Sequence, residues 1–312
     1  MTLTFWLVVF TVSVIVLVKA ADYFTDSSEK LGLALGISPF IVGITIVSIG
    51  TSFPELISSI VATVQNVTEI VIANVIGSNL FNILMIIGFA AIFAKRLIIT
   101  RDLINLDLPL LASFTALFIV ACIWDRKFTF VEGIISLLAF LTYLHYSVKS
   151  KTVVEEEKVR KKGKITIKLI FAVVCSAFFV FLGAKYMVES VVKLSEITGI
   201  GTSVISLTAV AAGTSFPELF VSVVAAIKRK FELALGNILG SNIFNISLVT
   251  GISALIRPLY VSNSILTLGI PFLIIATLLM IFSGISKKIH NWEGAIMLLI
   301  YLIFLGKLFN FI

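Results

Sequence analysis

One apolar stretch that carries a carboxylate occurs twice in this chain, and it constrains the fold more than any other feature. The first copy runs from GTSFPE at 50–55 to NVIGSNLFN at 74–82, and GTSFPE and NILGSNIFN recur 163 positions later. Between 50–83 and its copy, 18 of 34 residues are identical. A bias in composition would not keep a proline and a glutamate at fixed positions, so the chain contains an internal duplication.

The composition indicates that this duplication lies in a membrane. Hydrophobic residues make up 59% of the 312 residues and charged residues 13%, whereas a soluble domain has about 45–50% and about 25%. The net charge of +7 comes from basic residues in short loops, so it does not indicate a nucleic-acid partner. No positive region or cleavage site accompanies the first apolar segment, so we expect that segment to stay in the mature protein.

Ten apolar segments are long enough to cross the hydrocarbon core as helices, which takes about 20 residues each. We predict them at 3–24, 37–64, 69–93, 104–124, 129–148, 166–192, 201–227, 232–256, 262–284 and 291–311. The alternating segments of about 10 residues that a β-barrel needs are not found in the sequence. The chain is therefore predicted to be an all-α polytopic membrane protein with ten transmembrane helices.

A charged segment divides the predicted helices into two groups of five. We predict one transporter domain with a first five-helix repeat at 1–148, a cytoplasmic linker at 149–165 and a second repeat at 166–312. Basic residues gather in the loops on the side of the linker, so the positive-inside rule places both termini outside. Because five is an odd number, the second repeat is inverted relative to the first. Two inverted-topology repeats are the architecture of alternating-access transporters.

Glu55 and Glu218 are the unusual residues of the duplicated stretch. A charge at the bilayer centre costs roughly 2.5–3.5 kcal/mol. Of the 17 acidic residues, only these two lie near the middle of a span with no basic residue nearby. Pro54 and Pro217 precede them and free a main-chain carbonyl one turn earlier. A protonated glutamate bonded within the bundle is the alternative, but the duplication favours paired carboxylates that bind a cation.

Hydroxyl and amide side chains accompany each glutamate at helical spacing. These polar residues are Ser48, Thr51, Ser52, Ser78 and Asn82 in the first copy and Thr214, Ser215, Ser241 and Asn245 in the second. Hydrogen bonding between helices remains an alternative role for the asparagines, Ser78 and Ser241. Oxygen ligands without sulfur or imidazole suit Ca²⁺ and Na⁺. One Ca²⁺ or two Na⁺ would neutralise two glutamates, and ions that alternate at one buried charge make an exchanger.

The GTSxPE and GSNxxN motifs resemble the α-repeats of the sodium/calcium exchanger family, within the cation/calcium antiporter superfamily. The strong match covers about 50–88 and 213–251, and the ten-helix layout extends it over the chain. The resemblance implies two inverted five-helix halves, with Ca²⁺ bound by Glu55, Glu218, Thr51 and Thr214. It also implies that Na⁺ is held by Ser52, Ser78, Ser215, Ser241 and the carbonyls of Ser48 and Ala211, with Asn82 and Asn245 completing the centre.

We therefore expect a Na⁺/Ca²⁺ antiporter in the cell membrane. A H⁺/Ca²⁺ or broader cation antiporter is the alternative, because glutamates bind protons as well as Na⁺. In the potassium-dependent branch an acid replaces Asn245, so the asparagine argues against K⁺. An enzyme is not expected, because no HExxH or GxSxG motif occurs. We expect no cofactor, no nucleic-acid partner and a monomer in the lipid bilayer, with Ca²⁺ and Na⁺ as the transported ions.

Overall fold

The computed structural model of the chain describes residues 3–66, 68–99, 107–149, 165–198 and 202–309. At some positions within these ranges, among them 202–212, it describes the backbone but not the side chain. The predicted linker at 149–165 lies almost entirely outside these ranges, so its boundaries stay a prediction.

Helices make up almost all of the described residues. In chain order they are α1 (Leu3–Leu35), α2 (Pro39–Val42), η1 (Gly43–Val47), α3 (Ser48–Val64), α4 (Glu69–Leu80), η2 (Phe81–Ile86), α5 (Ile87–Phe93), α6 (Asp107–Trp124), α7 (Phe130–Lys149), α9 (Ile167–Thr198), α10 (Thr202–Ile227), α11 (Phe231–Ile243), η3 (Phe244–Val249), α12 (Thr250–Ile256), η4 (Ile265–Gly269), α13 (Ile270–Ser286) and α14 (Asn291–Leu308). The segments named η are π-helical turns within longer helical rods.

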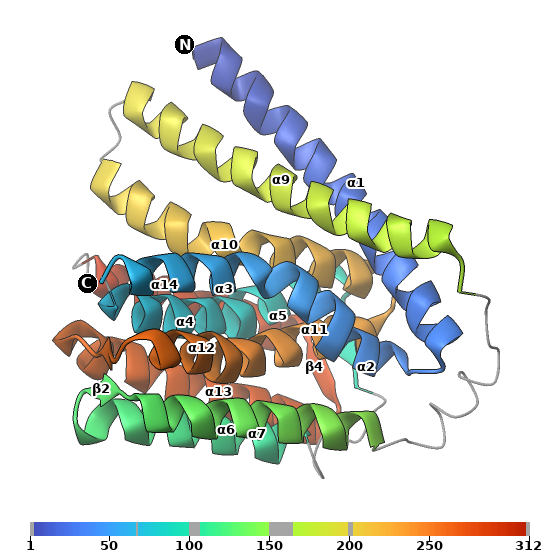
Figure 1. Ribbon diagram of the computed structural model, residues 1–312. Helices are drawn as coiled ribbons and strands as arrows, with labels where there is room; N and C mark the ends of the chain where they lie inside the picture. The colour runs from blue at the N-terminus through green and yellow to red at the C-terminus, as the bar shows by residue number, and fades with distance from the viewer. Residues whose placement is uncertain (1–2, 67, 100–106, 150–164, 199–201, 310–312) are drawn as a thin grey trace.

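The described part of the chain has nine helices that are long and apolar enough to cross a membrane. The second half of α10, Gly213–Ile227, is a shorter apolar helix and accounts for the remaining predicted span. The prediction of an all-α polytopic membrane protein is thus confirmed. The two ends of the chain lie at the same end of the bundle (Figure 1), as an even number of crossings requires.

Contacts between the two halves come in equivalent pairs. Strand β1 (Arg96–Ile98) pairs antiparallel with β4 (Lys288–His290), and β2 (Lys127–Phe128) pairs antiparallel with β3 (Leu259–Tyr260). β1 and β3 begin 163 positions apart, so each half contributes one equivalent strand to each pair. In the same way α5 packs on α14 of the other half, and α12 packs on α7. This pairing is what two inverted repeats require, and the short strands were not predicted from the sequence.

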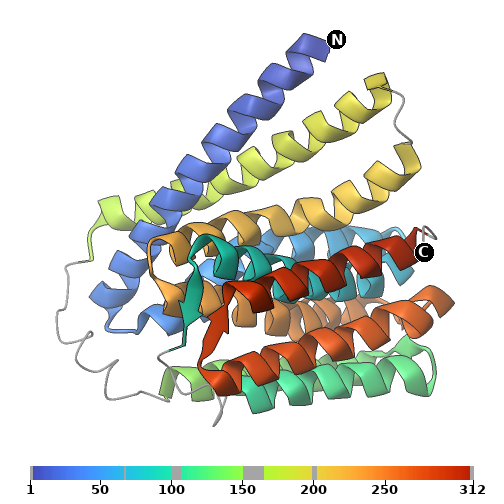
Figure 2. The same cartoon turned by 180° about the vertical axis from the view of Figure 1, so that it is seen from behind.

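The centre of the bundle is formed by the duplicated segments. The rods α11–η3–α12 and α4–η2–α5 are mostly buried, whereas most residues of α1 and α9 are not. α1 and α9 pack along each other and cross over one side of the bundle, as Figures 1 and 2 show. The duplicated helices therefore lie inside, and the first helix of each half lies outside them.

The same turn links the paired helices in both copies. Asn66 follows α3 with a φ of 63°, and Arg229 follows α10 with a φ of 59°. These residues are 163 positions apart, and both adopt the left-handed conformation that reverses the chain after a helix. The predicted divisions of 37–93 and 201–256 into two helices each are confirmed at these turns.

α1 is longer than the sequence predicted, because it ends at Leu35 and not at residue 24. Its 33 residues measure about 50 Å at 1.5 Å per residue, which exceeds a hydrocarbon core of about 30 Å. A helix of this length is accommodated by tilt, and α1 runs obliquely to the bundle in Figure 1. Its last turns carry acidic residues, and these have partners far away in the sequence.

Ion pairs join the second half of α1 to the turn between α10 and α11. Lys228 Nζ lies 2.7 Å from Asp22 Oδ1 and 2.9 Å from Asp26 Oδ1. Lys230 Nζ lies 2.6 Å from Asp26 Oδ1 and 2.7 Å from Glu29 Oε2. Burial lowers the pKa of Lys230, but hydrogen bonds and charges from Asp26 and Glu29 outweigh it and leave the pKa raised. Both lysines thus stay charged at neutral pH, and the cluster tethers α1 to the second copy of the motif.

Candidate ion-binding site

The two glutamates of the duplicated motif are buried at the centre of the bundle. Glu55 lies in α3 and Glu218 in α10, and each is 1% exposed. Each directly follows a proline inside its helix, Pro54 or Pro217. A proline in a helix interior removes one backbone hydrogen bond, so each carboxylate lies beside a weakened turn of main chain.

Each glutamate accepts a hydrogen bond from the serine of the other copy. Ser52 Oγ donates to Glu218 Oε1 at 2.7 Å, and Ser215 Oγ donates to Glu55 Oε1 at 3.2 Å. Ser241 Oγ lies 2.9 Å from Ser52 Oγ and brings α11 into the same network. These reciprocal bonds draw both carboxylates to the crossing of α3 and α10.

The threonines of the motif lie on the same crossing. Each directly precedes one of the serines, and Thr51 Oγ1 lies 3.1 Å from the carbonyl oxygen of Val47 and 3.2 Å from Asn237 Oδ1. Ser48 is also buried, and its hydroxyl donates to the carbonyl of Ile44 one turn earlier. Its own carbonyl lies 3.4 Å from Thr51 Oγ1.

Ala211, the remaining residue that the sequence singled out, lies in α10 one turn before Ser215. Only its backbone is described.

Several buried polar atoms of the motif have no hydrogen-bond partner among the described residues. Those on the predicted site residues are Glu55 Oε2, Glu218 Oε2, Ser78 Oγ, Asn245 Oδ1 and both Asn82 Oδ1 and Asn82 Nδ2, and Ser59 Oγ and Asn242 Oδ1 belong to the same duplicated stretch. Buried polar groups are normally paired, and leaving one unsatisfied costs about 1–3 kcal/mol. Five unsatisfied oxygens on the predicted site residues are what a bare cation would satisfy.

The amide of Asn245 is oriented by a neighbour that the sequence did not single out. Asn245 Nδ2 donates to Asn79 Oδ1 at 3.2 Å, and Asn79 Nδ2 donates to the carbonyl of Asn242 at 3.2 Å. Since the amide nitrogen is engaged, the oxygen of Asn245 is the atom left free. Asn79 and Asn242 are themselves duplicates, and the GSN part of the motif was the signal that could have found them.

Both site asparagines lie in π-helical turns. η2 begins one residue before Asn82, and η3 begins one residue before Asn245. π-turns inside α-helices occur frequently at functional sites, because the wider turn redirects side chains and leaves backbone groups out of the regular ladder. The sequence predicted plain helix here, since nothing in the local pattern separates a π-turn from an α-turn.

The donor set defines the kind of ion that fits. Oxygen atoms of carboxylates, hydroxyls and amides make up the predicted site, and it contains two carboxylates. Among the described residues no group of three or more His, Cys, Asp and Glu side chains could hold a metal ion. Hard oxygen ligands of this kind favour Ca²⁺ and Na⁺ over Zn²⁺ or Cu⁺.

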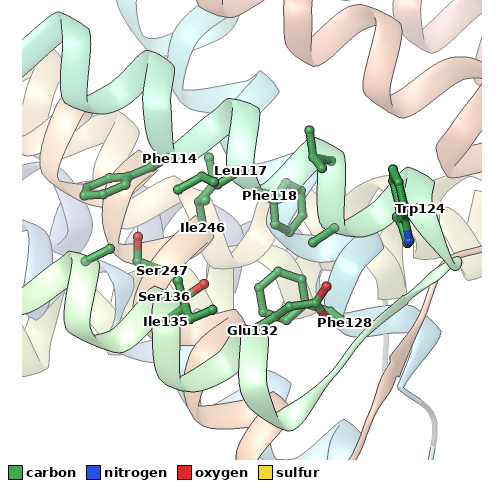
Figure 3. Close-up of a pocket in the computed structure, with 13 residues that line it drawn as sticks. Phe114, Leu117, Phe118, Trp124, Phe128, Glu132, Ile135, Ser136, Ile246 and Ser247 are labelled. Carbon is green, nitrogen blue, oxygen red and sulfur yellow. The ribbon is translucent and has the colours of Figure 1, made fainter.

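A cavity of about 210 Å³ lies between α6, α7 and η3, and neither glutamate is among the residues that line it. Figure 3 shows aromatic side chains, among them Phe114, Phe118 and Trp124, along its wall. Its carboxylate, Glu132, accepts a hydrogen bond from the backbone of Thr129 at 2.5 Å and serves the start of α7. An apolar lining with one engaged carboxylate does not suit a cation.

Comparison with known proteins gives consistent results over the whole chain. The family described as sodium/calcium exchanger protein matches residues 5–149 and 168–309. The sodium/calcium exchanger MaX1 of Methanosarcina acetivorans is 34% identical over 94% of this chain and 95% of its own. The inner membrane protein YrbG of Escherichia coli is 29% identical over 79% of this chain and 78% of its own. A solved structure of the sodium-calcium exchanger NCX_Mj, soaked with zero Na⁺ and Ca²⁺, has a TM-score of 0.81 at 28% identity and covers 98% of this chain and 100% of that one.

Proposed function

Since the chain belongs to the sodium/calcium exchanger family, we propose that it is a Na⁺/Ca²⁺ antiporter. In this proposal Ca²⁺ and Na⁺ exchange by alternating access at one central site with two glutamates. The relative MaX1 and the structural neighbour NCX_Mj both carry the name sodium/calcium exchanger.

The observation that carries the proposal is the reciprocal pairing of Glu55 and Glu218 with serines of the opposite copy. It gathers two carboxylates at 1% exposure, and the second oxygen of each has no hydrogen-bond partner in the described part of the chain. Two buried negative charges need a counter-charge of +2, because an uncompensated buried charge is expensive. One Ca²⁺ or two Na⁺ supplies it, so binding of one ion type excludes the other.

The residue roles follow the resemblance to the family. We assign Ca²⁺ to Glu55 and Glu218 with Thr51 and Thr214, as that resemblance implies. The residues assigned to Na⁺ are the serines and carbonyls around them: Ser52, Ser78, Ser215, Ser241, Ser48 and Ala211. Asn82 and Asn245 complete the centre through amide oxygens, which supports their role because both oxygens are buried without a partner.

The proposed orientation has both termini outside. The excess of lysine and arginine in the loops on the side of 149–165 supports it. The start of α1 and the end of α14 lie toward one end of the bundle, which agrees with both termini being on one side. Fusion of a reporter whose activity depends on its compartment to either terminus tests this arrangement.

Flux measurements in proteoliposomes test the exchange itself. We expect ⁴⁵Ca²⁺ uptake driven by an outward Na⁺ gradient with the pH clamped, and no change on adding K⁺. Uptake that follows a pH gradient and ignores Na⁺ would favour the H⁺/Ca²⁺ or broader cation antiporter. Ca²⁺ flux that needs no counter-ion at all would indicate a channel and contradict the proposal.

A further inference from the structure

The two copies of the motif are packed differently, although their sequences match. On α11, Asn237 and Gly240 are fully buried. Their counterparts on α4, Asn74 and Gly77, are only half-buried. The same helix face is therefore covered in the second copy and partly open in the first.

The covered face forms a contact that we call the η1–α11 seam, made where Gly43 of η1 meets Gly236 and Gly240 of α11. A Cβ atom at Gly236 would lie 2.3 Å from the carbonyl oxygen of Phe40, and one at Gly43 would lie 2.5 Å from the carbonyl oxygen of Leu233. A Cβ at Gly240 would lie 2.8 Å from a Cα atom of η1. No side chain fits here, so the two backbones touch through glycines.

The first copy cannot form an equally close seam. Among the side chains and backbone that the structure describes, a Cβ atom at Gly77 would meet nothing within 4 Å. Gly236 and Gly43 correspond to Ala73 and Ser206, 163 positions away. Because even a methyl group at Gly236 collides with backbone, a helix that carries Ala73 at the equivalent position cannot be approached as closely. Two of the three glycines that close the seam are thus present in one copy only.

The arrangement of the helices agrees with one closed and one open seam. α2 and η1 pack directly on α11. The first turns of α10 diverge from the rest of the bundle in Figures 1 and 2, together with the first turns of α1 and the last turns of α9. The open seam therefore faces the end of the bundle at which the chain begins.

The closed seam also reaches the candidate ion site through Asn237. Its Oδ1 accepts a hydrogen bond from Thr51 Oγ1 at 3.2 Å, and its Nδ2 donates to Ser222 Oγ at 2.8 Å. The hydroxyl of Thr51 has one proton, and the carbonyl oxygens of Val47 at 3.1 Å and Ser48 at 3.4 Å compete with Asn237 for it. In the first copy the counterpart of Ser222, Ser59, is buried with its hydroxyl unpaired. The hydrogen bond from Asn237 to Ser222 in the second copy therefore has no equivalent at Ser59 among the described residues.

We propose that the η1–α11 seam is an asymmetric clamp that favours the conformation described here, and that Asn237 is a positioning residue that holds Thr51 in the ion site while the seam is closed. The opposite conformation, with the seam at α4 closed, is packed less closely and is less populated. The inference of a clamp depends only on helix packing. The role of Asn237 in ion binding rests on the proposed function.

Thiol labelling tests the clamp without any transport measurement. In protein with both natural cysteines changed to alanine, in nanodiscs, we expect a reporter Asn74→Cys, on the half-buried face of α4, to react readily with a charged methanethiosulfonate. Gly236→Ala opens the closed seam and should slow this labelling at least threefold. Gly294→Ala is the matched control, because a Cβ there lies 2.7 Å from the carbonyl oxygen of Gly88 in a contact away from the seam. It should leave the rate unchanged.

A second variant avoids overpacking, in case Gly236→Ala does not fold. Ala73→Gly combined with Ser206→Gly gives the first copy the two glycines that it lacks relative to the second. It should slow labelling of a reporter Asn74→Cys at least threefold relative to Asn74→Cys alone. Labelling at the parental rate in a folded variant of either design overturns the clamp.

Calcium titration of the purified protein tests the role of Asn237. We expect Asn237→Ala to raise the Kd for Ca²⁺ at least fivefold, and Asn74→Ala to change it less than twofold. The positioning role also requires that Asn237→Ala has little further effect in a Thr51→Val background, since the hydroxyl it holds is then gone. Full additivity of the two changes overturns that role. If the parental protein binds no Ca²⁺, the proposed function fails, while the labelling result still decides the clamp.

Discussion

Replacing Glu55 or Glu218 by glutamine keeps the shape of the side chain and removes one of two buried negative charges. At an effective dielectric constant of about 20, Ca²⁺ and a carboxylate about 4 Å apart attract each other by about 8 kcal/mol. If the cost of desolvating the carboxylate offsets two-thirds of this, about 2.7 kcal/mol remains, or about a hundredfold in affinity. We expect either change to raise the Kd for Ca²⁺ by about that factor and to abolish detectable exchange.

Both glutamine variants should still fold and insert, because a neutral amide costs less to bury than a carboxylate. The bonds from Ser52 and Ser215 also survive, since the side-chain oxygen of glutamine still accepts them. Ca²⁺ titration of the purified protein and ⁴⁵Ca²⁺ exchange in proteoliposomes measure the two effects. Glu132→Gln is the matched control, because the same substitution there touches a carboxylate on α7 outside the motif. It should leave the affinity near the parental value.

The reasoning fails if both glutamine variants bind Ca²⁺ within threefold of the parental affinity. That result would mean that the ion does not sit between the carboxylates, whatever the family of the chain. A loss in only one of the two variants would place Ca²⁺ against one glutamate, and the buried −2 charge would then need another partner.

Three further outcomes are expected. Asn245→Asp adds a third carboxylate and should be tolerated, with a changed competition of Na⁺ and K⁺ against Ca²⁺ in flux assays. Ser52→Ala removes a hydrogen bond to a charged group, which contributes about 1.5–3 kcal/mol, so the Kd for Ca²⁺ should rise about tenfold or more. Removing the tether with Lys228→Ala and Lys230→Ala deletes partly exposed ion pairs of about 0.2–1 kcal/mol each. The unfolding temperature should fall by about 2–4 °C, and by less in 1 M salt.

The ten spans could be predicted because length and hydropathy report the membrane directly. The end of α1 could not, because the sequence around Asp22 and Asp26 resembles the polar end of a span. Their partners Lys228 and Lys230 are about 200 positions along the chain, and only the folded bundle brings them together. The two short strand pairs depend in the same way on contacts between the halves.

The candidate site shows a similar limit. Helical spacing correctly grouped Ser52 with Glu55 on one face of α3, because a three-residue interval places two side chains on the same side. It could not indicate that Ser52 donates to Glu218 and not to Glu55, since that depends on where α3 and α10 cross. Spacing identifies which side chains share a face, and the fold decides what that face meets.

The positions at which the two copies agree and differ fit an exchanger with unequal end states. The copies are identical at the glutamates and at most of the hydroxyl and amide groups beside them, and Ser48, which is matched by Ala211, is the exception. In the proposed mechanism these shared groups offer an ion the same oxygens from either side of the membrane. They differ at Gly43 and Ser206, and at Gly236 and Ala73, where only helix packing is affected. A duplicated site keeps the chemistry of both conformations alike, and these unmatched packing residues give one conformation the lower free energy.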